Sequence, residues 1–200
     1  MAISNSKEWY NKSEIDYFSA FLKLWLAFNA FYKRLYQHNA SLNNDRKFIE
    51  EIKNNNNIVK TKFEEYFTNS QSSQAIEFRF YLSEFIRKYS GVRSGNKSIK
   101  KDDSISLKPQ MNGRVVDEID FSSFIHSRNN SLKNKNIRGF IKIEHIYIKD
   151  DINLIFPFFI EMLYMMRNSL VHGTMEPTDE NHQSIKCCYI MLRILIKDLV

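Results

Sequence analysis

The sequence predicts an all-α protein: a bundle of four to six helices with a long basic loop or small β insertion at about residues 91–150. Its 200 residues include only 5 Gly and 3 Pro, too few for the frequent turns of a sandwich or barrel. Hydrophobic residues make up 43% and aromatic residues 14%, enough to build a core and to exclude wholesale disorder. This length fits one domain, residues 1–200, that needs no metal or disulfide to fold.

Helical periodicity begins near the N-terminus. Ser13 to Asp16 has the pattern of a helix start, with Ser13 as the N-cap. Apolar residues then recur every three or four positions as far as Leu35. They cover so broad a face that this helix is expected in the middle of a bundle or at a subunit contact. Two shorter helices are expected over residues 44–53 and 57–67.

A longer amphipathic helix is expected from about Ser73 to Tyr89, closed by Gly91. Beyond it the composition changes to Ser, Asn, Lys and Gly, which marks the insertion. Within the insertion, residues 141–147 alternate between apolar and polar, the period of a short strand. A partner strand or a helical turn fits Val115, Val116 and Ile119.

The insertion also carries a basic stretch. Between Phe121 and Ile143 there is no acidic residue, and the basic ones are Arg128, Lys133, Lys135, Arg138 and Lys142. Such a patch attracts phosphate backbones through counterion release, so we expect Lys133, Lys135 and Arg138 to bind RNA. A solvated loop that happens to be basic fits the same composition.

Two helices are expected after the insertion. The first begins near Asp151, with Pro157 in its first turn or at a kink, and Gly173 is its C-cap. The last begins at Pro177-Thr178-Asp179. Its adjacent cysteines fit two small buried residues in a reducing compartment rather than a disulfide or zinc site: Cys187 and Cys188.

The sequence favours a cytoplasmic protein without a membrane partner. Residues Met1 to Lys12 contain no apolar secretion signal. The longest apolar stretch, taken as Tyr17 to Tyr32, is too short and too polar to span a bilayer. Net charge is +6, from 29 Lys and Arg against 23 Asp and Glu, a modest bias toward anionic partners.

One segment can carry chemistry: Met166-Arg167-Asn168-Ser169-Leu170-Val171-His172-Gly173. On a helix, Asn168 and His172 are four residues apart and share a face with Glu161 and Tyr164, and Arg167 can reach round to that face. The negative end of the helix dipole favours a protonated imidazole, and an Arg offers a fork of donors to phosphate oxygens. Together these side chains can bind a phosphodiester and move a proton at a ribose 2′-hydroxyl, with no metal or other cofactor.

The Arg-to-His spacing by itself is weak evidence for a catalytic site. Arg138 and His145 show a similar spacing inside the insertion. His172 fits equally well as a C-cap histidine that satisfies the terminal carbonyls of its helix.

The segment from Arg167 to His172 resembles the R-x(4–6)-H motif of the HEPN superfamily, including the polar residue after the Arg. Two further segments are similar to one branch of that superfamily. They are the aromatic stretch from Leu24 to Tyr32 and the Gly-x-x-x-Pro lead into the last helix, from Gly173 to Pro177.

This resemblance implies a HEPN-like bundle, a homodimer whose paired motif helices form one cleft, and a metal-independent endoribonuclease that acts as a toxin or in antiviral defence. In that reading His172 is the acid/base, Arg167 clamps the phosphate and Asn168 orients either one. Two alternatives remain. A catalytically silent module would bind RNA, nucleotide or a partner protein, and a scaffold or antitoxin-type partner would have Arg167 and His172 engaged in intrachain hydrogen bonds.

Overall fold

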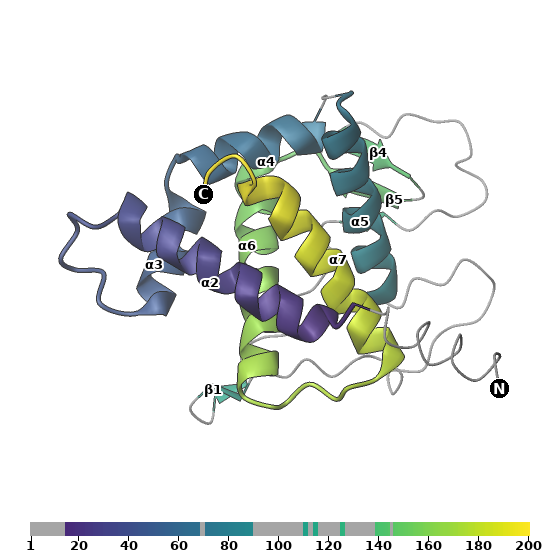
Figure 1. The fold of residues 1–200 in the computed structure, drawn as a ribbon. Coiled ribbons are helices and arrows are strands. Elements are labelled where there is room, and N and C mark those ends of the chain that lie inside the picture. Colours follow the sequence, from purple (N-terminus) through teal and green to yellow (C-terminus); the bar gives the residue numbers. More distant parts are fainter. Residues whose placement is uncertain are drawn as a thin grey trace, which may run out of the picture.

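The computed structural model describes residues 15–68, 71–89, 139–144 and 146–200, and three two-residue strands between 110 and 126. Helices make up most of the described chain, which confirms the all-α prediction with a small β part (Figure 1). The helices are α2 (Tyr17–Leu35), α3 (Asp45–Asn54), α4 (Ile58–Thr68), α5 (Ser73–Tyr89), α6 (Ile152–Val171) and α7 (Asp179–Ile196).

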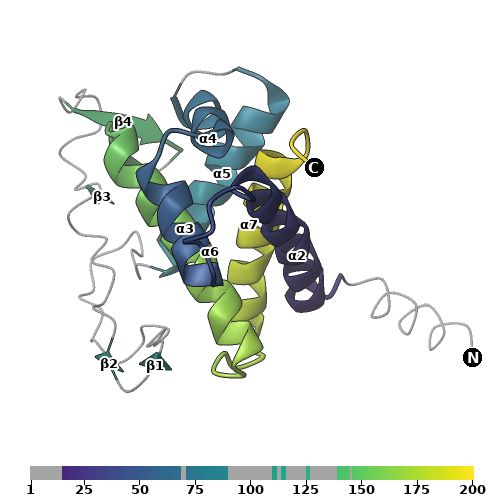
Figure 2. The same cartoon turned by 90° about the vertical axis from the view of Figure 1, so that its left-hand side faces the viewer.

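The two C-terminal helices organise the bundle. Helix α7 packs against both α5 and α2, and α6 packs mainly against α3, with further contacts to α2, α4 and α7 (Figures 1 and 2). The centre is filled with aromatic rings, which bury large apolar areas and pack edge to face. The largest fully buried side chains are Trp25, Tyr32, Phe21, Phe28, Phe63, Phe67, Phe78, Phe85, Phe156 and Phe159.

Helix α2 begins later than its sequence pattern predicts. The N-cap is Asp16, whose carboxylate accepts hydrogen bonds from the backbone N–H groups of Phe18 and Ser19. Ser13, the predicted N-cap, lies outside the described residues. Helix α2 buries one broad face and leaves Leu26 66% exposed on another, so it is not enclosed in the middle of the bundle.

The ends of α6 and α7 agree with the sequence. Thr178 is the N-cap of α7 and accepts from the backbone N–H of Asn181. The C-cap of α6 is His172, and Gly173, the predicted C-cap, follows it with a φ of +65° and ends the helix. Both cysteines of α7 are buried and free. Pro157 is the sixth residue of α6 and lies in its second turn, so the first-turn alternative is wrong.

The longest apolar stretch was predicted at Tyr17 to Tyr32, and helix α6 shows that this is wrong. Of the described helices, Ile152–Val171 is long and apolar enough to cross a membrane, and it is longer than the stretch chosen from the sequence. Yet 61% of that window is buried inside the fold, as in the core helix of a soluble protein. Its apolar residues serve the core because α3, α2, α4 and α7 surround it.

The predicted strand at 141–147 is a hairpin. Strand β4 (Phe140–Ile143) pairs antiparallel with β5 (Ile146–Lys149), and Glu144 lies between them at a φ of 49°. An alternating pattern that continues across a tight turn does not reveal the turn. Strand β3 (Ile125–His126) also pairs with β5, and Val115 belongs to β2 (Arg114–Val115), whose partner is β1 (Gln110–Met111). Gly91, Val116 and Ile119 lie outside the described residues.

Candidate active site

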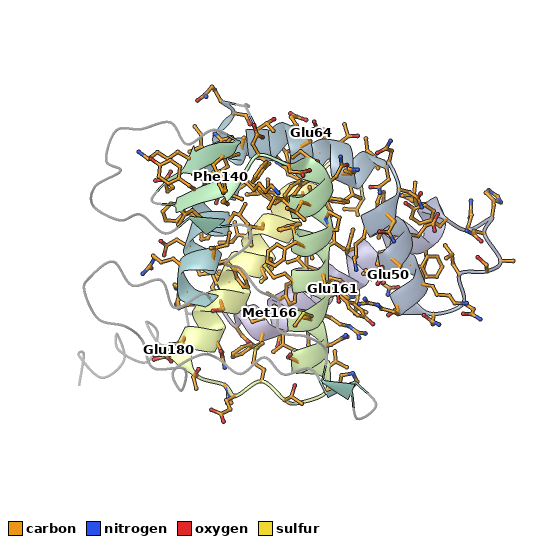
Figure 3. The ribbon with its side chains drawn as sticks, turned by 180° about the vertical axis from the view of Figure 1, so that it is seen from behind. Glu50, Glu64, Phe140, Glu161, Met166 and Glu180 are labelled. Carbon is orange, nitrogen blue, oxygen red and sulfur yellow. The ribbon has the colours of Figure 1, made fainter. Side chains whose placement is uncertain are left out.

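The polar face of α6 is covered by α3. Glu161, Tyr164 and Asn168 follow each other at spacings of three and four along α6, so they lie on one side of the helix. Figure 3 shows Glu161 turned toward the helix that carries Glu50, which is α3. The face that the sequence marks as polar is therefore an interface between two helices of the same chain.

The middle of this interface is a cluster of paired charges. Glu161 of α6 accepts hydrogen bonds from Arg46 and from Lys53, the latter at 2.7 Å, and its side chain is only 17% exposed. Glu50 pairs with the same two cations, with 3.1 Å between its carboxylate and the Lys53 ammonium. Burial alone would raise the pKa of Glu161, but the hydrogen bonds from Arg46 and Lys53 hold it below its ordinary value.

Two buried tyrosines, Tyr164 and Tyr32, lie between this cluster and the C-terminal end of α6. The Arg46 guanidinium lies over the ring of Tyr164, 5.6 Å from its centroid, and that ring packs on Trp25. Tyr32 of α2 is fully buried, and its hydroxyl accepts a hydrogen bond from the Asn29 amide at 2.6 Å. Burial and the nearby Asp45 carboxylate raise the pKa of Tyr32, partly offset by the charge of Arg167.

Arg167 lies at the end of this interface. Its Nη1 donates to the Asn168 side-chain oxygen at 2.9 Å, so the guanidinium does reach round to the polar face. Its Nη2 lies 3.8 Å from a carboxylate oxygen of Asp45, the first residue of α3. The other oxygen of Asp45 is 3.2 Å from the Lys33 ammonium of α2. Asn168 is 5% exposed, whereas Arg167 keeps 22% of its side chain open.

His172 follows at the C-cap of α6 and is exposed. The terminal carbonyls are satisfied by backbone groups: Gly173 donates to Leu170 at 3.2 Å and Thr174 to Ser169 at 3.0 Å, the pattern of a Schellman motif. Among the residues that the structure describes, the imidazole has no hydrogen-bond partner. The helix end is therefore capped without the His172 side chain.

The structure thus joins two of the predicted site residues and leaves the third open. Arg167 is bonded to Asn168, whereas His172 bonds to neither within the described chain. The predicted RNA-binding residues lie outside the described residues: Lys133, Lys135 and Arg138. The described part of the chain contains no cluster of side chains suited to a metal ion.

Sequence reasoning missed the contribution of α3. Asp45 precedes Arg167 by more than a hundred positions, and its only signal was an acidic residue in the first turn of an expected helix. Such residues are common because they favour the helix dipole. Nothing in the sequence pairs Asp45 with Arg167 rather than with another cation.

Comparison of the chain with protein-family models, with curated proteins and with solved structures found no match. The chemistry of the site is therefore argued from its own residues.

Proposed function

We propose that this protein is a metal-independent endoribonuclease of the HEPN type that cuts RNA through attack by the 2′-hydroxyl. The supporting observation is the end of α6. A partly open Arg167 is oriented by Asn168, and five residues later the C-cap His172 is exposed and has no partner among the residues that the structure describes. Phosphate binding needs a cation with N–H donors to spare, such as Arg167, and proton transfer needs an accessible imidazole, such as that of His172.

Arg167 is suited to hold a phosphate. A guanidinium carries five N–H donors, and among the described residues the bond to Asn168 engages one of those of Arg167, whose side chain is 22% exposed. The 3.8 Å approach to Asp45 is longer than a charge-assisted hydrogen bond, so a phosphate oxygen can take those donors. Negative charge that develops on the phosphate in the transition state is then stabilised by a donor already in place.

His172 is suited to move protons because no described group engages its imidazole. As the 2′-oxygen forms its bond to phosphorus, the 2′-hydroxyl proton passes to the imidazole base. The bond from phosphorus to the 5′-oxygen breaks, and that oxygen leaves with a proton from an imidazolium or water. The products are a 2′,3′-cyclic phosphate and a 5′-hydroxyl, and no metal enters this sequence of steps.

Incubation of the purified protein with total RNA in EDTA tests this proposal. We expect cleavage that persists in the chelator, product ends that carry a cyclic phosphate, and no cleavage of an oligonucleotide with a deoxyribose at the cut site. Cleavage of DNA, or loss of activity in EDTA with return on adding a divalent cation, would contradict attack by the 2′-hydroxyl.

The second candidate function is a silent module that binds RNA, a nucleotide or a partner protein. The observation that favours it is the engagement of Arg167 inside the chain, by Asn168 and toward Asp45. This candidate predicts RNA affinity that depends on Arg167 with no turnover. Filter binding and cleavage measured on the same samples distinguish the two functions.

The proposed assembly is a cytoplasmic homodimer in which the ends of two α6 helices meet, so that two motifs share one cleft. Val171, beside His172, is 50% exposed and gives that end an apolar contact. A toxin or antiviral-defence role would add an antitoxin or defence-system partner. Light scattering tests the assembly, and a monomer at tens of micromolar would contradict it.

A further inference from the structure

Arg167 is held from two sides that differ in strength. On one side Asn168, its neighbour in α6, accepts a true hydrogen bond at 2.9 Å. On the other side the Asp45 carboxylate stands 3.8 Å away, which is charge attraction without a hydrogen bond. The guanidinium is therefore directed by two elements, α6 and α3, while its N–H groups on the Asp45 side stay available for a substrate.

Asp45 is itself fixed in place. It is the first residue of α3, directly after the N-cap Asn44, whose side chain accepts from the Lys47 backbone N–H at 3.0 Å. Its second oxygen is 3.2 Å from the Lys33 ammonium at the end of α2. The positive end of the α3 dipole adds to this attraction. The carboxylate thus links three helices, and Arg167 is the member of the group that faces the proposed site.

We propose that Asp45 is a positioning residue for Arg167, with Lys33 as its anchor. This inference rests on the proposed ribonuclease function and deepens it. An arginine has four flexible side-chain bonds, and a clamp on a transition state is effective only when its donors are already aimed. Asp45 supplies that aim by its charge, and it does not touch the substrate.

Asp45→Asn removes the charge and keeps the size of the side chain. We expect kcat to fall by about tenfold, because the guanidinium loses its second constraint. KM is expected to stay equal or to fall, because the RNA backbone meets one negative charge fewer. A loss that came only from poorer folding would lower the amount of active protein and leave KM and the kcat of each folded molecule unchanged.

Glu50→Gln is the matched control. It removes one negative charge from the same helix, at a residue that pairs with Arg46 and Lys53 and not with Arg167. We expect wild-type kcat and KM for this variant. An equal loss in both variants would overturn the proposal, since it would place the effect in the docking of α3. Wild-type kcat in Asp45→Asn, or a raised KM alone, would also overturn it and would leave the ribonuclease function standing.

A measurement that needs no activity separates the two proposals. Isotope-edited NMR follows the rotation of the Arg167 guanidinium, and Arg167→Lys identifies its signal by loss. We expect rotation to be slow in the wild type and in Glu50→Gln, and faster in Asp45→Asn. If the wild type cuts no RNA, the ribonuclease function fails, and this comparison still decides whether Asp45 positions Arg167. Equal rotation in all three proteins overturns that role.

Discussion

The two ends of the α3–α6 interface use the same kinds of side chain differently. Around Glu161 every charge has partners at hydrogen-bonding distance, and each of the two cations pairs with two carboxylates. Around Arg167 the nearest carboxylate of the described residues, that of Asp45, is too far for a hydrogen bond, and His172 beyond it has no described partner. Fully paired charges hold helices together, whereas unsatisfied donors at a surface remain free to bind a ligand. The difference locates the candidate site at one end of the interface.

The largest effect should come from His172→Ala. If the Arg167 and His172 end of the interface is catalytic, cleavage should fall by about a hundredfold to ten-thousandfold, the usual contribution of general acid–base catalysis. The measurement is initial-rate cleavage in EDTA. His38→Ala is the control, because His38 is also exposed but lies in the turn after α2. Similar losses in both variants would contradict a catalytic role for His172.

Arg167→Ala should cost a similar amount, and Arg167→Lys should recover little, because an ammonium lacks the paired donors of the guanidinium. The losses of Arg167→Ala and His172→Ala should not add in the double variant, since the two groups act on one transition state. Cleavage rates of the wild type, the three single variants and the double variant test this. Full recovery by Lys would mean that Arg167 supplies only charge.

A substitution in the Glu161 cluster should change the stability of the fold rather than the rate of cleavage. Glu161→Gln removes the more buried of the two carboxylates that Arg46 and Lys53 share, and we expect a loss of about 2 kcal/mol in the free energy of unfolding. Glu65→Gln, which breaks the exposed pair with Lys62, should cost about 0.5 kcal/mol. Urea denaturation measures both. Cleavage by each folded molecule should be unchanged in Glu161→Gln, and a large loss of activity there would remove the contrast between the two ends.

The same comparison depends on pH. The pKa of Glu161 is lower in the folded chain than its ordinary value of 4.5. Its stabilisation is therefore complete above that value and is lost as the pH falls through the lower folded pKa. The difference in unfolding free energy between wild type and Glu161→Gln should shrink below about pH 4.5. A difference that stays constant to lower pH would show that the carboxylate is not stabilised by its partners.

A smaller effect than that of Glu161→Gln should come from Gly173→Ala. A Cβ at this position meets no atom within 4 Å, so the only cost is the left-handed backbone at a φ of +65°. We expect about 1 kcal/mol of destabilisation, and less for Gly173→Asn, because Asn tolerates this conformation. Thermal unfolding measures the difference. Equal costs for Ala and Asn would argue that something other than the backbone angle limits this turn.

The helices were predictable because their signals are local. Spacing of apolar residues, an N-cap at Thr178 and a glycine after His172 act within a few residues, and the structure confirms them. The start of α2 was missed because Asp16 fits two roles, an acid inside the first turn or the cap itself. The hairpin at β4 and β5 was missed because alternation does not mark a turn.

The sequence by itself determined which residues form helices, where α6 ends, and that Arg167, Asn168 and His172 lie near that end. Only the tertiary structure decided that α3 covers the polar face of α6, that Arg46 and Lys53 form ion pairs with Glu161, and that Asp45 lies beside Arg167. Any of the chain's 29 basic residues could pair with any of its 23 acidic ones. The choice is made by how the helices pack, and burial of apolar surface is the main driving force for that packing.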